Sequence, residues 1–282
     1  MQNDREIIRS RQNRTVVETA KLTDRKAREA SKSFRFDGVK LLQEALKNGL
    51  EIETVLFKAS AKDAILNTLS KSLGKDFLVS VGRAVTLSDE VFDKISEEKS
   101  PEGVICVAKY IDKIQKIVTI YNSEDFSAMQ NERIVLLESV RDPANIGAII
   151  RSAAALGVDR LILSADCADI YHPRAVRASM GTLFNQPIDR VERLPSVIAG
   201  LRRSGRRVFA AALDEEAYRL GSFAYQTGDC VVIGNEGHGL RLETMEACDQ
   251  RVFIPMSGRA ESLNAAVAAS VLMWELVARD LR

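Results

Sequence analysis

Three short segments of the chain bring together amides, a hydroxyl, a guanidinium and glycines, residue types that bind and orient ligands. The first segment contains Asn145 and Arg151 and follows the apolar run 134–137. If that run is a strand, both residues lie near its carboxyl end, where ligands bind in open α/β sheets. The alternative for Arg151 is a charge that reaches solvent from an otherwise apolar helix.

The second segment is the glycine-rich stretch 234–240, which follows the apolar run 231–233. Its glycines are spaced G-x-x-G-x-G, which differs from the dinucleotide-binding pattern G-x-G-x-x-G. Glycines in such a loop allow the backbone to approach a ligand closely, and the alternative is a plain tight turn. Glu236 stands between glycines, which favours a functional loop. His238 has no histidine or cysteine at metal-ligand spacing, so no metal site is expected.

The third segment follows the apolar run 252–254 and contains Ser262, Leu263 and Asn264. Ser262 is a suitable N-cap, which predicts a helix that starts there. This helix is apolar nearly all round, so it should be buried on more than one side. Packing against a second copy of the same helix would achieve this, and we therefore expect a homodimer.

The elements that position these segments are typical of an α/β protein. From residue 132 to 282, apolar strands alternate with helical patterns, which predicts a mostly parallel sheet covered on both faces. The expected strands are 134–137, 161–163, 208–211, 231–233 and 252–254, and the expected helices include 145–156, 173–181 and 195–204. A smaller α/β domain, residues 1–108, precedes them, with strands expected at 55–57, 77–79 and 104–108. Its first 35 residues are predicted to form a loosely attached helix, and residues 109–131 a connector.

Composition limits the class of protein. A length of 282 residues favours two domains, and 46% hydrophobic with 28% charged residues excludes disorder and coiled-coil repeats. The net charge of +1 excludes a uniformly basic coat for nucleic acid, yet residues 1–40 hold eleven Lys and Arg against six Asp and Glu. The four cysteines are too far apart for a CxxC pair. With no signal peptide or membrane span expected, the sequence predicts a soluble cytoplasmic protein.

Taken together, the segments N-x-G-x-x-x-R, G-N-E-G-x-G and I-P-M-x-G-x-x-E-S-L-N resemble the three motifs of the SpoU/TrmH class of RNA 2′-O-ribose methyltransferases. Residues 10–13, 36–46 and 100–104 are similar to the RNA substrate-binding domain that precedes the catalytic domain in many members. The resemblance implies a SPOUT-like fold in which a deep trefoil knot, roughly 208–264, lies at the C-terminal end of the sheet.

The resemblance also implies the cofactor, S-adenosylmethionine, and no metal. The residues that would hold the cofactor are Leu213, Gly234, Asn235, Gly237, Ile254, Met256 and Leu263.

The resemblance assigns the catalytic roles as well. Arg151 would accept the proton of the ribose hydroxyl, which is chemically awkward because a guanidinium is normally charged. The alternative is that the hydroxyl pairs with Arg151 and its proton passes to phosphate or water. Glu236 would fix Arg151 or accept the proton itself. Asn145, Ser262 and Asn264 would orient the ribose and its phosphates.

The expected partner is RNA, and ribosomal RNA is favoured. Transfer RNA as the substrate and base methylation by a related knotted enzyme remain alternatives. An RNA-binding module without catalysis would have lost motif residues that are present here. A small-molecule enzyme on a nucleotide-binding sheet is disfavoured by the G-x-x-G-x-G spacing.

Overall fold

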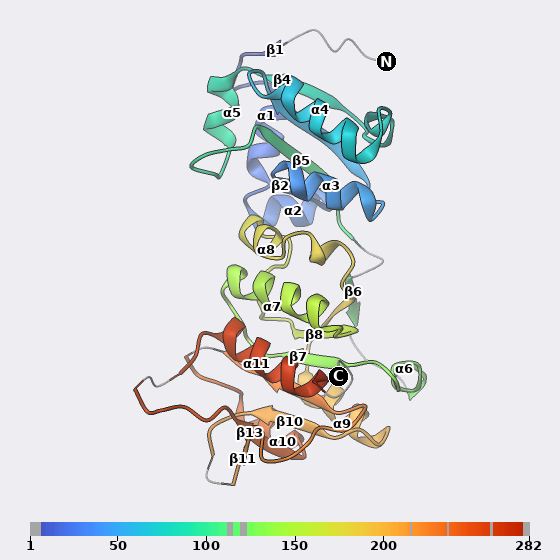
Figure 1. Cartoon of the computed structure of the whole chain (residues 1–282), viewed down its shortest axis with the longest axis vertical. Helices are drawn as coiled ribbons and strands as arrows, with labels where there is room; N and C mark the ends of the chain where they lie inside the picture. The colour runs from blue at the N-terminus through green and yellow to red at the C-terminus, as the bar shows by residue number, and fades with distance from the viewer. Residues whose placement is uncertain are drawn as a thin grey trace. The chain divides into compact units, whose positions relative to one another are not determined.

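The computed structural model describes residues 7–111, 115–118, 123–214, 216–235, 237–259 and 262–278. These residues form two compact units (Figure 1). The first unit comprises the residues through Ile111 together with Asp169–Asn185. The second unit comprises the rest of the chain.

The first unit contains a mixed five-stranded sheet with the strand order β1-β4-β3-β5-β2. Its strands are β1 (Ile7–Ile8), β2 (Ser33–Asp37), β3 (Ile52–Lys58), β4 (Ala84–Leu87) and β5 (Val104–Lys109). β5 is antiparallel to both of its neighbours, whereas β4 is parallel to β1 and β3. The predicted strand at 77–79 is wrong, because Phe77–Ser80 forms the 3₁₀ helix η1. Phe77 is buried in that turn. The apolar run 77–79 therefore indicated a buried side chain correctly, but not an extended strand.

The helices of the first unit include two in the basic N-terminal segment, where one loosely attached helix was expected. The helices are α1 (Arg14–Lys21), α2 (Arg25–Ser31), α3 (Val39–Lys47), α4 (Lys62–Leu73), α5 (Asp89–Ile95) and α8 (Pro173–Ala178). Val16 of α1 and Arg28 of α2 are each 1% exposed. The expectation of loose attachment was therefore wrong, since both helices bury a side chain in the unit.

The segment Asp169–Asn185 belongs to the first unit, although the sequence boundaries put it in the second domain. The ring of Tyr171 stacks on Tyr110 at a centroid distance of 4.0 Å and packs against Phe34 at 4.8 Å. Asp169 pairs with Arg28, with 2.6 Å between Oδ2 and Nη2. Aromatic packing and a buried ion pair thus draw this segment, with α8 and the 3₁₀ helix η2 (Thr182–Phe184), into the first unit.

The second unit is built on an eight-stranded sheet with the order β11-β13-β10-β12-β7-β8-β9-β6. Its strands are β6 (Gln115–Val118), β7 (Ile134–Leu137), β8 (Arg160–Ser164), β9 (Ile188–Val191), β10 (Val208–Ala211), β11 (Tyr218–Arg219), β12 (Cys230–Ile233) and β13 (Gln250–Phe253). Every neighbouring pair is parallel, and all residues of β7 and β12 are buried. Continuous apolar strands of this kind are typical of a parallel sheet with both faces covered, as predicted.

Helices cover the sheet of the second unit. They are α6 (Ser123–Ala128), α7 (Pro143–Leu156), α9 (Leu194–Arg203), α10 (Leu242–Ala247) and α11 (Ala265–Val277). α9 packs on β10 and shares a buried apolar cluster with Ile134 and Leu136 of β7, while α7 and α11 lie side by side (Figure 1). Strand β6 and helix α6 belong to this unit, so residues 109–131 are more than the connector that was expected. None of the described helices is long and apolar enough to cross a membrane.

Candidate functional site at the carboxyl edge of the sheet

The three sequence segments follow β7, β12 and β13, so they meet at the carboxyl edge of the parallel sheet. A pocket of about 260 Å³ opens there. We call it the carboxyl-edge pocket, and its lining residues are Ala211, Ala212, Leu213, Ile233, Gly234, Asn235, Gly239, Val252, Phe253, Ile254, Met256, Ser262, Leu263, Ala265, Ala268 and Leu272. Six of the seven predicted cofactor residues line it, and Gly237 does not. The mixture of apolar side chains with backbone polar groups is typical of a small-molecule site.

The glycine-rich loop forms one wall of this pocket. A Cβ on Gly234 would lie 2.5 Å from the carbonyl carbon of Gly239, so only glycine fits there. Asn235 and Gly239 close the turn with two backbone hydrogen bonds of 3.0 Å. The Asn235 side chain accepts hydrogen bonds from the amides of Gly237 and His238, at 2.9 and 3.2 Å. The loop is therefore a tight turn whose backbone also lines a pocket. Both interpretations of its glycines, a tight turn and a close approach of the backbone to a ligand, are compatible with this geometry. Glu236 lies outside the described residues.

The third segment joins the first through a pair of asparagines. Asn264 is the N-cap of α11, and its Oδ1 accepts hydrogen bonds from the amides of Ala266 and Val267. Its Nδ2 donates to Oδ1 of Asn145 on α7 at 3.0 Å. The predicted N-cap Ser262 is wrong, because the helix starts at Ala265, but Ser262 lines the pocket. Asn264 is better placed to cap because its side chain also reaches α7.

Arg151 lies apart from these groups. It is exposed on α7, does not line the carboxyl-edge pocket, and has no ion-pair partner within the described part of the chain. It stands six positions after Asn145, which corresponds to about 9 Å along a helix and about 120° around its axis. The structure therefore places Ser262 in the pocket lining. The bonded pair Asn145 and Asn264 lies beside the pocket, since Asn264 follows the lining residue Leu263, and Arg151 does not reach it. The next residue, Ser152, bonds to Ser270 of α11 with 2.8 Å between the hydroxyl oxygens.

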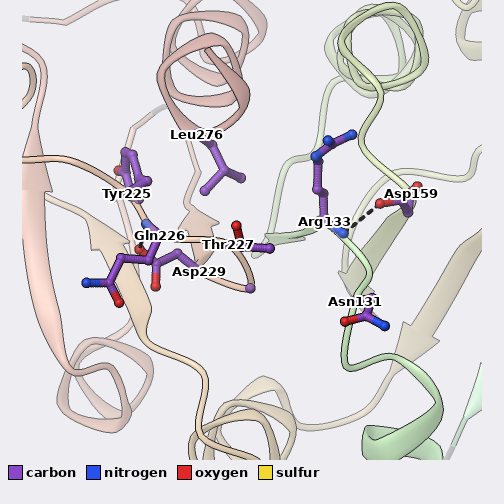
Figure 2. A pocket seen from close by; sticks show the side chains of 9 residues that line it. Asn131, Arg133, Asp159, Tyr225, Gln226, Thr227, Asp229 and Leu276 are labelled. Atoms are coloured by element: carbon purple, nitrogen blue, oxygen red, sulfur yellow. Dashed lines mark hydrogen bonds between the residues drawn. The ribbon is translucent and has the colours of Figure 1, made fainter. Parts of the chain in front are cut away.

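A second pocket, of about 320 Å³, lies at the opposite edge of the sheet (Figure 2). Its residues Arg133, Asp159 and Asp229 directly precede β7, β8 and β12. Asp159 accepts a hydrogen bond from the amide of Arg133 at 2.7 Å, drawn as the dashed line in Figure 2. Asp229 accepts one from the amide of Gln226 at 2.6 Å. The Asp229 carboxylate also pairs with the side chain of Arg207. Since both carboxylates already have partners and no motif residue lines this pocket, we assign the functional site to the carboxyl edge.

Sequence reasoning missed several pocket residues. Most are small or aliphatic and stand at strand ends or on the inner side of α11, namely Ala211, Ala212, Ala265, Ala268 and Leu272. Alanines and leucines are typical core residues, so their residue type alone does not indicate that they line a pocket. The positions of Ala211 and Ala212 at the end of the run 208–211 are the only hint.

Comparison with known proteins identifies the family to which the chain belongs. Residues 132–274 match the SpoU rRNA Methylase family, and residues 13–106 match the MRM3-like substrate binding domain. The chain belongs to the SpoU rRNA methylase family. Its sequence is 29% identical to that of the 23S rRNA (guanosine(2553)-2′-O)-methyltransferase RlmP of Bacillus subtilis (strain 168), over 95% of this chain and 98% of the relative.

Two further family relatives are similar over nearly their whole length. The 23S rRNA (uridine(2479)-2′-O)-methyltransferase of Streptomyces viridochromogenes is 32% identical, over 96% of this chain and 91% of the relative. The crystal structure of an AdoMet-bound rRNA methyltransferase from Sinorhizobium meliloti superposes with a TM-score of 0.78 at 28% identity, over 98% of each chain. Both matched domains of the present chain therefore have counterparts in these relatives.

Proposed function

We propose that this protein transfers a methyl group from S-adenosylmethionine to a ribose 2′-hydroxyl in ribosomal RNA. The observation that carries the proposal is the carboxyl-edge pocket of a member of the SpoU family. Residues of the second and third motifs line this pocket, and Asn145 of the first motif bonds to Asn264 of the third. Two relatives similar over most of their length are named as 23S rRNA 2′-O-methyltransferases.

The residues of the pocket fit the cofactor. Leu213, Ile254 and Met256 offer apolar surface for an adenine ring, and Leu213 and Met256 are 83% and 44% exposed. Gly234, which has no room for a side chain, presents bare backbone to the cavity. The volume of about 260 Å³ is close to the lower end of small-molecule sites, about 300 Å³. When bound, S-adenosylmethionine supplies a methyl group on a positively charged sulfur.

The chain supplies orientation and a route for the proton. The ribose oxygen forms a bond to the methyl carbon, the carbon–sulfur bond breaks, and the hydroxyl proton must leave. We assign the Asn145 and Asn264 amides, which already bond to each other, to holding the ribose at the mouth of the pocket. Ser262 lines the same pocket and offers a hydroxyl to a phosphate or ribose oxygen. Glu236 and Arg151 remain the two proposed partners for the proton.

We further propose that the enzyme is a homodimer formed through α11. Val267, Val271 and Trp274 follow one another at helical spacing and are 50%, 37% and 50% exposed. A second copy would cover this apolar stripe. Arg151 precedes Ser152, which bonds to Ser270 of the same helix α11, and we propose that Arg151 acts at the pocket of the partner subunit. This would explain why it stands apart from the pocket of its own chain.

The trefoil knot is part of the same proposal. In the strand order, β13 lies on one side of β10, while α11, which follows it, packs on α7 and β12 on the other side. The chain must therefore cross the carboxyl edge near the loops after β10 and β12, as a knotted connection requires. The cytoplasmic location is also proposed, and the cysteines support it, since Cys106, Cys167, Cys230 and Cys248 are all free thiols.

The first unit is proposed to bind the RNA. Its N-terminal segment carries the surplus of basic residues, and Lys and Arg contacts to phosphate supply affinity without reading sequence. The matched substrate binding domain, residues 13–106, supports this role.

The experiment is methyl transfer from labelled S-adenosylmethionine into unmodified ribosomal RNA and, separately, transfer RNA, followed by digestion to nucleosides and mass spectrometry. We expect label on a ribose 2′-oxygen of ribosomal RNA. Label on transfer RNA would change the substrate class, and label on a base atom would overturn the reaction. Failure to bind S-adenosylmethionine in calorimetry would overturn the cofactor assignment.

A further inference from the structure

The carboxylate of Asp166 joins three parts of the second unit. Asp166 follows β8, and its Oδ1 accepts a hydrogen bond of 2.6 Å from the hydroxyl of Ser164 at the end of that strand. Its Oδ2 accepts from the hydroxyl of Ser139, just beyond β7, at 2.6 Å. The same oxygen accepts from Nη2 of Arg241, just beyond the glycine-rich loop, at 2.6 Å. One carboxylate therefore ties two strand ends to the segment that leaves the loop.

Ser139 is the point at which this network meets the pocket wall. Its φ is +55°, a left-handed conformation that is uncommon for residues other than glycine and costs of order 1 kcal/mol. Its amide donates to Oγ of Ser164 at 2.9 Å, and its carbonyl oxygen accepts from Nδ2 of Asn235 at 2.8 Å. Asn235 lines the pocket and closes the loop. A strained backbone held at every polar atom is typical of a site whose geometry matters.

Arg241 is held at its backbone as well as at its side chain. The buried carboxylate of Glu138, 1% exposed, accepts a hydrogen bond from the Arg241 amide at 2.7 Å and from the Thr244 hydroxyl at 2.6 Å. The glycine-rich loop therefore starts at Gly234, at the end of β12, and finishes at a residue fixed by two carboxylates.

We propose that Asp166 and Arg241 are positioning residues for methyl transfer, which hold the glycine-rich loop and the strained Ser139 in the arrangement that shapes the cofactor pocket. This inference rests on the proposed function. Neither residue lines the pocket, so each acts through Ser139 and Asn235. Losing either would leave the fold intact while the pocket wall, Gly234 and Asn235, loses its fixed position.

The opposing interpretation is an ordinary surface ion pair, since the side chains of Arg241 and Asp166 are 48% and 34% exposed. Such pairs are worth about 0–1 kcal/mol and leave function unchanged. The chain offers a matched control, because Arg202 and Asp249 form a pair of 2.7 Å with exposures of 44% and 28% in the same unit. Neither of these two residues lines the carboxyl-edge pocket.

The test compares Arg241→Ala, Asp166→Asn and the control Arg202→Ala in the full-length protein. Calorimetry gives the Kd for S-adenosylmethionine, kinetics with ribosomal RNA give kcat and KM, and thermal unfolding gives Tm. We expect Arg241→Ala and Asp166→Asn to raise the Kd about tenfold and lower kcat by about tenfold or more, as small misplacements do. The KM for RNA should stay within about twofold, because neither residue is proposed to contact the RNA.

Two further variants sharpen the comparison. Arg241→Lys keeps a positive donor for Asp166 and should recover part of the cofactor affinity. The double variant Arg241→Ala/Asp166→Asn should be little worse than either single one, since both break the same contact. Arg202→Ala should lower Tm by a similar amount to Arg241→Ala and leave Kd and kcat within about twofold.

Unchanged Kd and kcat in folded Arg241→Ala and Asp166→Asn would overturn the inference. If Arg241→Ala fails to fold, Asp166→Asn and Arg241→Lys decide the question. If the wild-type protein binds no S-adenosylmethionine, the proposed function fails, and hydrogen exchange then tests the network alone. The amides of Gly237 and Gly239, which close the loop, should exchange faster in Arg241→Ala than in Arg202→Ala, and equal rates would overturn the positioning role.

Discussion

Asn145 and Asn264 share a hydrogen bond of 3.0 Å between amide groups that lie 119 positions apart in the chain. Asn264 uses its other amide atom to cap α11, so one side chain serves helix stability and the site together. This division predicts two separable effects. Asn264→Ser keeps a good capping oxygen but loses the amide that reaches Asn145.

We expect Asn264→Ser to stay within about 0.5 kcal/mol of wild type in free energy of unfolding and to lose most methyl transfer. Asn264→Ala should lose methyl transfer and about 1 kcal/mol of stability. The control is Asn13→Ala, which removes the N-cap of α1, where Oδ1 accepts from the Thr15 amide at 2.9 Å. It should cost a similar free energy with the cofactor Kd unchanged. Full activity of Asn264→Ser would contradict the role of the asparagine pair.

Gly234 and Gly237 belong to the same loop, but replacing each of them by alanine should have opposite effects on cofactor affinity. A Cβ on Gly234 would meet the backbone of Gly239 at 2.5 Å, whereas a Cβ on Gly237 would come no closer than 3.5 Å, to Oδ1 of Asn235. Gly234→Ala should therefore deform the pocket wall and raise the Kd for S-adenosylmethionine by about tenfold or more. Gly237→Ala should leave the Kd within about twofold. Calorimetry with both variants checks this, and equal affinities would show that the loop yields at Gly234.

The sheet of the second unit was predictable because its strands are buried on both faces. The apolar run 134–137 is fully buried as β7, and a continuous apolar run of this length is typical of a parallel strand covered on both faces. The helix start at Ala265 was not predictable, since Ser262 and Asn264 are both good caps and the choice depends on Asn145 far away in the sequence. Apolar periodicity identifies a buried face but not its partner, so α8 was assigned to the wrong unit.

The candidate site was predictable where residue type and backbone need coincide, as at Gly234 and Asn264. The network of Asp166 and Arg241 was not, because exposed charges in loops are typical of solvated surface. Glu138 gave the one available signal, since an acidic residue directly after a buried strand needs internal partners.

Arg28 and Asp169 form a buried ion pair inside the first unit, with side-chain exposures of 1% and 9%. Arg28 also donates to the carbonyl oxygens of Leu22 and Thr23, each at 2.8 Å. Arg28→Ala leaves the Asp169 carboxylate buried without its cation, which should cost about 3–5 kcal/mol in free energy of unfolding. Arg25→Ala, which breaks the exposed pair with Glu29, should cost at most about 0.5 kcal/mol. Denaturant unfolding measures both, and similar costs would contradict the anchoring of residues 169–185 by Arg28.

Trp274 is half exposed on α11 in line with Val267 and Val271. If a second copy covers this stripe, Trp274→Glu places a charge in an apolar interface and should convert the dimer to a monomer in sedimentation velocity. Val79→Glu is the control, because Val79 is 85% exposed in the first unit and stands alone. A wild-type protein that sediments as a monomer at the highest concentrations tested would overturn the dimer.

Asp166 links the network to pH. Partial burial acts to raise the pKa of Asp166, but hydrogen bonds from Ser139 and Ser164 and the positive charge of Arg241 outweigh it and hold the pKa below its ordinary value. Arg141, with 3.9 Å between Nη2 and Oδ2 of Asp166, is a second cation facing the carboxylate. The folded state thus favours the carboxylate more strongly than the unfolded state does.

The stabilisation by this carboxylate is fully present above the unfolded pKa of about 3.9. It disappears as the pH falls from there toward the lower folded value, because the unfolded chain binds the proton first. The difference in free energy of unfolding between wild type and Asp166→Asn should therefore be constant from about pH 5 to 7 and shrink below about pH 4. Asn13→Ala removes no titrating group, and its difference from wild type should show no such step. A gap for Asp166→Asn that persists unchanged to about pH 3 would mean that the carboxylate titrates alike in both states.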